Sequence, residues 1–368
     1  MGLSVGIVGL PNVGKSTLFN ALSSAKAEAA NYPFCTIEPN VGVVAVPDPR
    51  LAALDGVVHA DRIVPATIDF VDIAGLVRGA HKGEGLGNQF LANIREADAV
   101  VQVARCFEDP NVVHVENRVD PVADVETVTL ELCLKDLETV TKRGERARKM
   151  LKANSPIDKL ALEICDALAK HLDDGKPART FRLPDHADAA GIVREMHLLT
   201  QKPTFYIANV DEASLGNLER NQHFHALKVR AAAEGAPVVP ICAALEAQIA
   251  ELEPADRPEF LASAGLKEPG LHAVVRTGFE LPGLITFLTA GKSEVRAWTI
   301  RKGARAPQAA GAIHTDFEKG FIKAEVIWWE DFVRLGGEAK ARESGKMSIE
   351  GKEYVVRDGD VVHFKFNV

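Results

Sequence analysis

The amino-acid sequence predicts an α/β protein: a parallel sheet with helices on both faces, an inserted helical hairpin and a small C-terminal α+β domain. Three observations support this prediction. Short apolar segments alternate with helical stretches through the first hundred residues, as in parallel sheets. Between about 122 and 199, apolar residues recur every three or four positions, which is the period of an amphipathic helix. Beyond about 281, β-rich segments dominate again.

The expected strands of the sheet are short and apolar. The first, at 3–8, precedes a helix expected at 15–22. Further strands are predicted at 41–46, 66–71, 99–104, 204–208 and 237–241. Because two of them follow the helical region, that region is an insertion, and we predict one sheet domain comprising residues 1–120 and 203–280.

The insertion, residues 121–202, is predicted to be a helical hairpin, because an Asn-Ser-Pro break at 154–156 ends one helix and caps the next. The C-terminal part, residues 281–368, contains four β-rich segments. We predict a small α+β domain there, with a hairpin turn at the Asp-Gly-Asp of 358–360.

Composition excludes several classes of protein. The hydrophobic fraction of 46% and charged fraction of 26% are ordinary for a globular protein, and a net charge of -8 argues against a surface coated by nucleic acid. The five cysteines show no paired spacing, which indicates reduced thiols rather than disulfides or a zinc site. No apolar segment approaches the roughly 20 residues that span a bilayer. We expect a cytoplasmic monomer with neither membrane nor DNA as partner.

A glycine-rich loop, GLPNVGKST, follows the first predicted strand and opens a helix. It fits the Gly-x-x-x-x-Gly-Lys-Ser motif of P-loop nucleoside triphosphatases in the structural context that the motif requires. Its backbone N–H groups and the helix N-terminus favour phosphate. Lys15 is placed to reach the β- and γ-phosphates, and Ser16 to bind Mg²⁺. A glycine turn with a chance lysine is the weaker interpretation.

Two later segments are candidates for contact with the γ-phosphate and its metal. Asp72 and Gly75 belong to an Asp-x-x-Gly motif at a strand end, where the carboxylate suits Mg²⁺ coordination and the glycine N–H suits phosphate. Thr36, in the turn-rich segment NYPFCT, could complete the metal shell or could simply begin a strand.

The segment NVDE at 209–212 follows a predicted strand where a base-reading loop is expected. GTPases have Asn-Lys-x-Asp in this loop, and the Asp accepts hydrogen bonds from guanine N1 and N2. Here Glu212 replaces that Asp and Val210 replaces the Lys, while Asn209 can still meet a purine N7. Adenine offers no such pair of donors, so the change does not penalise it. The sequence therefore favours ATP over GTP.

A second base contact is predicted after the next strand. Cys242, Ala243 and Ala244 follow the strand expected at 237–241 and can offer a backbone N–H to the purine.

The segments GLPNVGKST, NYPFCTIEPN, DIAGLVRGAHKGEGLGNQFL, NVDE and CAALE, in this order, closely resemble the YchF ATPases, an Obg-related branch of the P-loop proteins. The resemblance covers essentially the whole chain, and the C-terminal part resembles a TGS domain. It implies hydrolysis of ATP in preference to GTP and association with the ribosome, through the large subunit or its RNA. It also implies phosphate binding by Asn12, Val13, Gly14, Lys15, Ser16 and Thr17, Mg²⁺ binding by Ser16, Thr36 and Asp72, and adenine contact by Asn209 and Glu212.

The residue that positions the attacking water is not evident. Leu76 follows Asp-x-x-Gly, where Ras-like enzymes have a water-orienting Gln. His81, in a glycine-rich loop, and His114, beyond the strand at 99–104, are two candidates, and an ordinary structural histidine is the alternative for each. A K⁺ ion held partly by Asn12 is a third hypothesis.

Basic residues cluster near the predicted hairpin tip, and they are either an RNA contact or a solvated helix end. They are Lys142, Arg143, Arg146, Arg148, Lys149 and Lys152. Trp328 and Trp329 fall in one predicted strand, so at most one of them faces the core by strict alternation. The leading hypothesis is an ATPase whose nucleotide state controls a contact with the ribosome. The alternatives are a true switch GTPase and a nucleotide-gated binding module with negligible hydrolysis.

Overall fold

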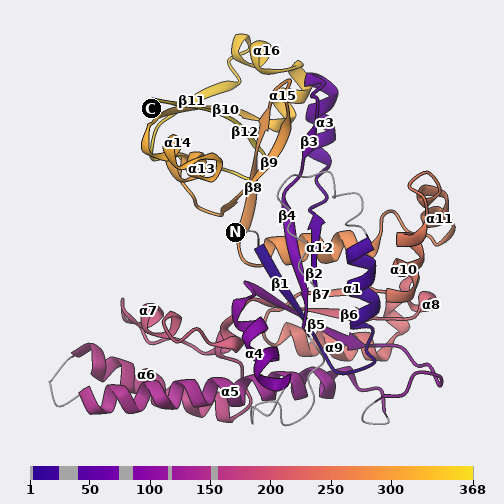
Figure 1. Ribbon diagram of the computed structural model, residues 1–368, viewed down its shortest axis with the longest axis vertical. Helices are drawn as coiled ribbons and strands as arrows, with labels where there is room; N and C mark the ends of the chain where they lie inside the picture. The colour runs from indigo at the N-terminus through magenta and orange to yellow at the C-terminus, as the bar shows by residue number, and fades with distance from the viewer. Residues whose placement is uncertain (1–2, 25–39, 74–85, 115–117, 151–155, 368) are drawn as a thin grey trace.

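The computed structural model describes residues 3–24, 40–73, 86–114, 118–150 and 156–367 (Figure 1). Its first sheet has the strand order β2-β4-β1-β5-β6-β7, and only β2 runs antiparallel to its neighbour. The strands are β1 (Leu3–Val8), β2 (Val41–Ala45), β4 (Thr67–Asp72), β5 (Ala99–Arg105), β6 (Thr204–Asn209) and β7 (Val238–Ile241). The α/β class is confirmed, and each of these strands lies within two residues of its predicted place.

Helices cover both faces of this sheet, as expected. One face carries α1 (Lys15–Ser24), α10 (Ala243–Glu251), α11 (Arg257–Ser263) and α12 (Gly270–Glu280), and the other carries α4 (Leu86–Glu96), α5 (Pro121–Met150) and α9 (Gln222–Ala232) (Figure 1). Short helices α8 (Glu212–Leu215) and η5 (Leu218–Arg220) connect β6 to α9. β5 and β6 are buried at every position, as central parallel strands must be when helices cover both faces.

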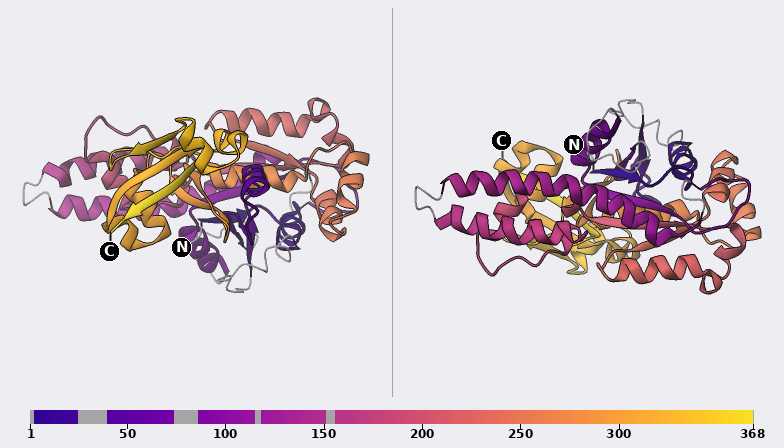
Figure 2. Two further views of the ribbon diagram at one scale, coloured as in Figure 1. Left: turned by 90° about the horizontal axis from the view of Figure 1, so that it is seen from above. Right: turned by 90° about the horizontal axis from the view of Figure 1, so that it is seen from below.

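The inserted segment is the antiparallel pair α5 and α6 (Pro156–Asp173), which projects beyond the sheet (Figure 2). Three shorter elements complete it: η3 (Ala178–Thr180), α7 (Ala189–Arg194) and η4 (Leu199–Gln201). Gly144 allows close approach of the two long helices, because a Cβ there would lie 3.2 Å from the Cβ of Cys165. None of the described helices is long and apolar enough to cross a membrane.

Buried polar groups fasten the insertion to the sheet domain. Asp136 of α5 accepts hydrogen bonds at 2.8 Å from the backbone N–H groups of Leu199 and Thr200. Glu234, after α9, accepts from Arg179, from Tyr206 Oη at 2.7 Å and from Arg230 at 2.6 Å. Buried charges of this kind are tolerated only when they are paired, so these bonds define how the insertion sits.

The C-terminal sheet has the order β11-β10-β12-β8-β9-β3. Five strands come from the C-terminal region: β8 (Leu284–Ala290), β9 (Val295–Arg301), β10 (Phe321–Trp328), β11 (Met347–Glu350) and β12 (Asp360–Phe366). Helices α13 (Ala306–Ile313), α14 (Thr315–Lys319), α15 (Trp329–Leu335) and α16 (Glu338–Glu343) accompany them. The sixth strand, β3 (Ile63–Val64), comes from the N-terminal part and pairs parallel with β9. The boundary at residue 281 and the TGS likeness stay predictions.

An ion-pair network joins the two parts. Arg50 of α3 (Pro49–Val58) binds Asp48 and Asp358, each at 2.8 Å, and also donates to the Thr286 hydroxyl at 2.8 Å. Asp358 in turn accepts a hydrogen bond from the Thr286 N–H at 2.9 Å.

The predicted hairpin at 358–360 is wrong. β12 pairs with β10 and β8, and the residues before Asp358 contribute only an isolated bridge from Val355 to Arg305. The aspartates are used otherwise, because Asp358 binds Arg50 and Asp360 accepts from the Arg357 N–H at 2.9 Å. The two tryptophans do not share a strand either: Trp328 ends β10 and is 39% exposed, whereas Trp329 begins α15 and packs against the core.

Candidate nucleotide-binding site

The predicted nucleotide-binding segments meet at the carboxyl edge of the first sheet, where ligands of parallel α/β folds bind. A cavity of about 480 Å³ opens there. Its lining residues are Asn12, Gly14, Thr17, Phe107, Glu108, Asp109, Pro110, Val112, Asn209, Val210, Asp211, Cys242, Ala243 and Ala244.

The loop between β1 and α1 has the backbone of a phosphate cradle. Asn12 and Gly14 adopt positive φ angles of 61° and 98°. A Cβ at Gly9 would lie 2.6 Å from the carbonyl oxygen of Val103, so close packing against β5 requires glycine. Val13 is buried, whereas Ser16 and Thr17 are exposed at the start of α1. N–H groups at a helix start and in such a loop suit an anion.

Lys15 is the first residue of α1, and Asp72 is the last residue of β4. Lys15 is 8% exposed, and its Nζ donates to the Leu10 carbonyl at 2.6 Å. Burial lowers the pKa of Lys15 to about 8, with the carboxylate of Asp72 opposing that shift. Burial likewise raises the pKa of Asp72, and Lys15 opposes it. The two side chains are therefore close enough to influence each other, as a phosphate-binding lysine and a metal-binding aspartate would be.

We expect ATP binding to weaken as the pH rises through about 8, because neutral Lys15 cannot pair with phosphate. Bound phosphate favours the ammonium form, so binding at pH 9 should take up about one proton per ATP and lose about tenfold in affinity per further pH unit. Calorimetry at pH 7 and pH 9, in two buffers of different ionisation enthalpy, measures this uptake.

Lys202→Met is the matched control for that titration. Burial also lowers the pKa of Lys202, but its Nζ donates to the Arg95 carbonyl at 3.0 Å rather than to the P-loop. The control should keep the proton uptake at pH 9. Absence of uptake in the unaltered protein would contradict the assignment to Lys15.

Asn209 connects the phosphate loop to the base side. Its Nδ2 donates to the Val13 carbonyl at 2.9 Å, and its Oδ1 accepts from the Ala243 N–H at 3.0 Å. The side chain is 4% exposed and reaches both loops from the end of β6. One Nδ2 hydrogen remains for a purine N7.

The base loop differs in detail from its prediction. Val210 lines the cavity but is 1% exposed and belongs to the core. Asp211 also lines the cavity, and its carboxylate caps α8 by accepting from the Ser214 N–H at 2.9 Å. Glu212 is exposed and is not among the lining residues. Cys242, Ala243 and Ala244, the residues at the start of α10, all line the cavity.

Sequence reasoning missed one wall of the cavity, the segment 107–112 after β5. It carries no recognisable motif. The only signal was a charged residue, Arg105, at the end of an apolar strand.

Of the two candidate histidines, only His114 belongs to the described part of the chain. It is 5% exposed, and its Nε2 lies 2.9 Å from Asp124 Oδ2. Burial raises the pKa of Asp124, although the hydrogen bond from His114 opposes this. Thr36, Gly75 and His81 lie outside the described residues.

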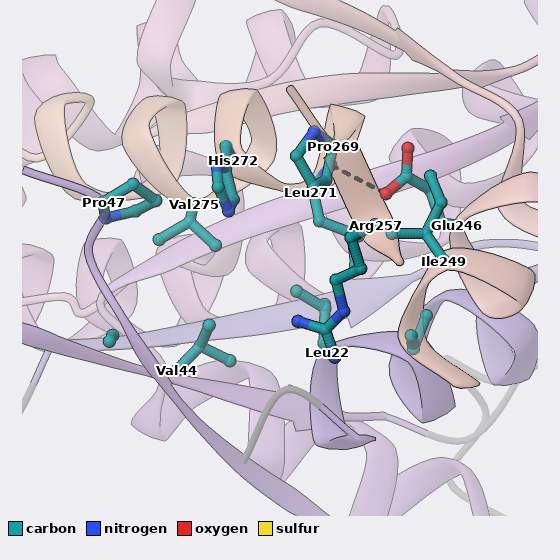
Figure 3. A pocket seen from close by; sticks show the side chains of 13 residues that line it. Leu22, Val44, Pro47, Glu246, Ile249, Arg257, Pro269, Leu271, His272 and Val275 are labelled. Atoms are coloured by element: carbon teal, nitrogen blue, oxygen red, sulfur yellow. Dashed lines mark hydrogen bonds between the residues drawn. The ribbon is translucent and has the colours of Figure 1, made fainter. Parts of the chain in front are cut away.

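A second cavity, of about 340 Å³, lies between α1, β2, α10 and α12 (Figure 3). Its walls are mostly apolar, with Arg257 and His272 at its side and the buried Glu246 at one end. Glu246 accepts from the Gly270 and Leu271 N–H groups at 2.7 and 3.3 Å, so its charge stabilises the start of α12. No P-loop residue lines this cavity, and we do not assign it to the nucleotide.

Among the described residues, one side-chain group in the C-terminal region has the composition of a metal site. Ligand atoms of Glu325, Glu338 and His363 lie within 4.8 Å of one another. Arg342 already binds both carboxylates, at 3.2 and 2.9 Å, which disfavours a cation there.

Comparison with known proteins gives consistent results. Residues 4–142 match the family described as a 50S ribosome-binding GTPase, and residues 284–367 match YchF-GTPase_C, described as a protein of unknown function. The chain is 53% identical over 368 residues to "Ribosome-binding ATPase YchF" of Haemophilus ducreyi and 50% identical to that of Bacillus subtilis, covering 100% of each chain. The solved Schizosaccharomyces pombe YchF GTPase is 37% identical, with a TM-score of 0.88 over 99% of this chain and 98% of that one.

Proposed function

The chain belongs to the YchF family of P-loop nucleoside triphosphatases, and on that premise we propose that it hydrolyses ATP in preference to GTP and binds the ribosome according to its nucleotide state. Relatives are named ribosome-binding ATPases. A ribosomal partner also supports the expectation of a cytoplasmic protein.

The base loop is the observation that carries the preference for ATP. The phosphate loop serves any nucleoside triphosphate, so discrimination must come from the base side. The Asp211 carboxylate is engaged by the Ser214 N–H and hydroxyl, at 2.9 and 3.0 Å. Glu212 is exposed outside the cavity lining. Neither Asp211 nor Glu212 is therefore arranged to accept the N1 and N2 donors of guanine together, whereas adenine has no such pair of donors to leave unpaired.

The proposed metal-binding and hydrolytic groups come from the P-loop and from the motifs that follow it in the sequence. Ser16, Thr36 and Asp72 would hold Mg²⁺, which neutralises the phosphates, while Lys15 and the Gly75 N–H would meet the γ-phosphate. The Asn12 amide nitrogen donates to the Val113 carbonyl at 3.1 Å, which leaves its oxygen for K⁺. His81 remains a candidate for orienting water. The burial of His114 beside Asp124 supports a structural role for that histidine.

The tip of the hairpin is the proposed contact with ribosomal RNA. Lys142, Arg146, Arg148 and Lys149 are exposed near the end of α5, and Lys152 lies outside the described residues. Arg148 forms an ion pair with Asp166 at a distance of 3.4 Å, and both side chains are 62% exposed. Such a weakly held, exposed cluster suits phosphate contact and predicts binding that falls with salt.

Calorimetric titration with ATP and GTP, in Mg²⁺ and K⁺ buffer, tests the nucleotide preference. We expect at least about tenfold tighter binding of ATP, a difference of about 1.4 kcal/mol. Glu212→Asp should narrow the difference, and Glu219→Asp, at an exposed glutamate of η5, should not. Tighter binding of GTP would favour the switch GTPase. Single-turnover kinetics with ribosomes would identify a binding module if no phosphate is released.

A further inference from the structure

The segment 107–112, which forms one wall of the nucleotide cavity, is held by a buried arginine. Arg105 is the last residue of β5 and is 2% exposed, among the largest side chains buried to that degree. Among the residues that the structure describes, no carboxylate forms an ion pair with it. A desolvated guanidinium without a counter-charge is costly, so its position needs a specific explanation.

The guanidinium is satisfied by the backbone of the loop that follows it. Its Nε donates to the Phe107 carbonyl at 3.1 Å, Nη1 to the Val112 carbonyl at 2.8 Å and Nη2 to the Asp109 carbonyl at 3.1 Å. Its Cζ also lies 4.7 Å from the centroid of the Phe107 ring. The guanidinium distributes its donors over three nitrogens and so reaches three separate carbonyls, whereas the three donors of a lysine ammonium all lie on one nitrogen.

The same loop is tied to nucleotide-binding residues at both ends. Where it begins, the Cys106 N–H donates to the Asn209 carbonyl at 2.7 Å. Where it ends, the Val113 carbonyl accepts from Asn12 of the P-loop at 3.1 Å. Between these ties, the side of the loop formed by 107–110 and Val112 lines the cavity. Arg105 thus determines the shape of a wall whose two ends already belong to the site.

We propose that Arg105 is a positioning residue for nucleoside recognition: its guanidinium holds the loop 106–113 as the wall against which the nucleoside of ATP packs. The inference rests on the proposed function for the identity of the nucleotide. The Nε, Nη1 and Nη2 atoms of Arg105 all bond to carbonyls of this loop, so its loss weakens binding of the nucleoside part and leaves hydrolysis of bound ATP intact. A purely structural arginine would instead affect folding without this separation.

Arg105→Lys and Arg105→Met test the proposal in the full-length protein. We expect the Kd for ATP to rise at least about tenfold in both. The kcat at saturating ATP should stay within about twofold, and so should the Kd for Mg²⁺-tripolyphosphate, measured by competition. Arg179→Lys is the matched control, since Arg179 of the insertion is another largely buried arginine and is bonded to Glu234. It should lower thermal stability and leave the Kd for ATP unchanged.

An unchanged Kd for ATP, an equal loss in kcat, or an equal loss of tripolyphosphate binding would overturn the proposal. Hydrogen exchange on the unaltered protein provides a test independent of any variant's folding. ATP should slow exchange of the amides of Glu108, Asp109, Asn111 and Val112, and tripolyphosphate should not. Equal protection by both would also overturn the proposal. If the protein preferred GTP, the proposed function would fail, but the rise in Kd for GTP would still report on Arg105.

Discussion

Gly14→Ala is expected to reduce ATP affinity by about 100-fold or more, because it places a methyl group where the Asn209 side chain lies. Gly14 has φ +98°, and a Cβ there would overlap Asn209 Nδ2. The substitution therefore combines backbone strain of about 1–3 kcal/mol with loss of the buried bonds from Asn209 to Val13 and Ala243, each worth about 1–3 kcal/mol when a partner is left unsatisfied. Both the phosphate loop and the base loop lose their common support.

Gly56→Ala is the control for that substitution. Gly56 lies within α3, and a Cβ there would meet no atom within 4 Å. The same chemical change should leave ATP affinity unaltered and raise the stability of the protein by about 0.5–1 kcal/mol. Titration calorimetry and thermal unfolding of both variants measure the contrast. Normal ATP affinity in Gly14→Ala would contradict the role of Asn209 as the bridge.

Glu234→Ala is expected to destabilise the protein by about 3–5 kcal/mol, because it leaves buried cations without their partner. The Glu234 side chain is 2% exposed and is paired with Arg179 and Arg230. Although burial opposes them, these arginines and Tyr206 hold the pKa of Glu234 below its usual range. Because the folded-state pKa is lowered, this contribution is complete above the unfolded pKa and disappears as the pH falls through the folded value.

Urea unfolding at pH 7 and pH 4 measures both parts of this prediction. Glu268→Ala is the exposed counterpart: Glu268 pairs with Arg276, with side chains 45% and 36% exposed. Its loss should cost at most about 1 kcal/mol. If the two variants were equally stable at pH 7, the buried cluster would not be what fastens the insertion.

Much of the fold was predictable because one chemical rule dominates each element. The strands of the first sheet are apolar runs that match their buried environment, and the Asn-Ser-Pro break at 154–156 separates α5 from α6. The predictions for the C-terminal region were wrong where a segment that resembles a local turn instead contacts residues far away in the sequence. Asp358 and Gly359 have the sequence of a hairpin turn. The aspartate instead forms an ion pair with Arg50, which is 308 residues away in the sequence. Local propensity carries no information about such partners.

Some residues of the nucleotide-binding site were likewise predictable from the sequence, and others were not. Phosphate-loop residues were predictable because backbone N–H groups, a lysine and a hydroxyl must follow in a set order. The placement of the base-loop residues was not predictable: Asp211 lines the cavity and Glu212 does not, because Asp211 is the N-cap of α8 and Glu212 is the first residue of that helix. Arg105 was missed because its hydrogen-bond acceptors are backbone carbonyls. Every residue has a backbone carbonyl, so no pattern of side chains in the sequence indicates these contacts.

The short strand β3 has a consequence for the order in which the chain folds during its synthesis. Arg62 and Glu294, which form an ion pair beside the β3–β9 pairing, are 232 residues apart. At a translation rate of roughly 5–20 residues per second, β3 waits roughly ten seconds or more for its partner to leave the ribosome. The strands of the first sheet are all synthesised by residue 241, so that sheet can form before the edge that β3 will occupy exists. The nascent protein thus acquires its nucleotide-binding loop well before its final shape.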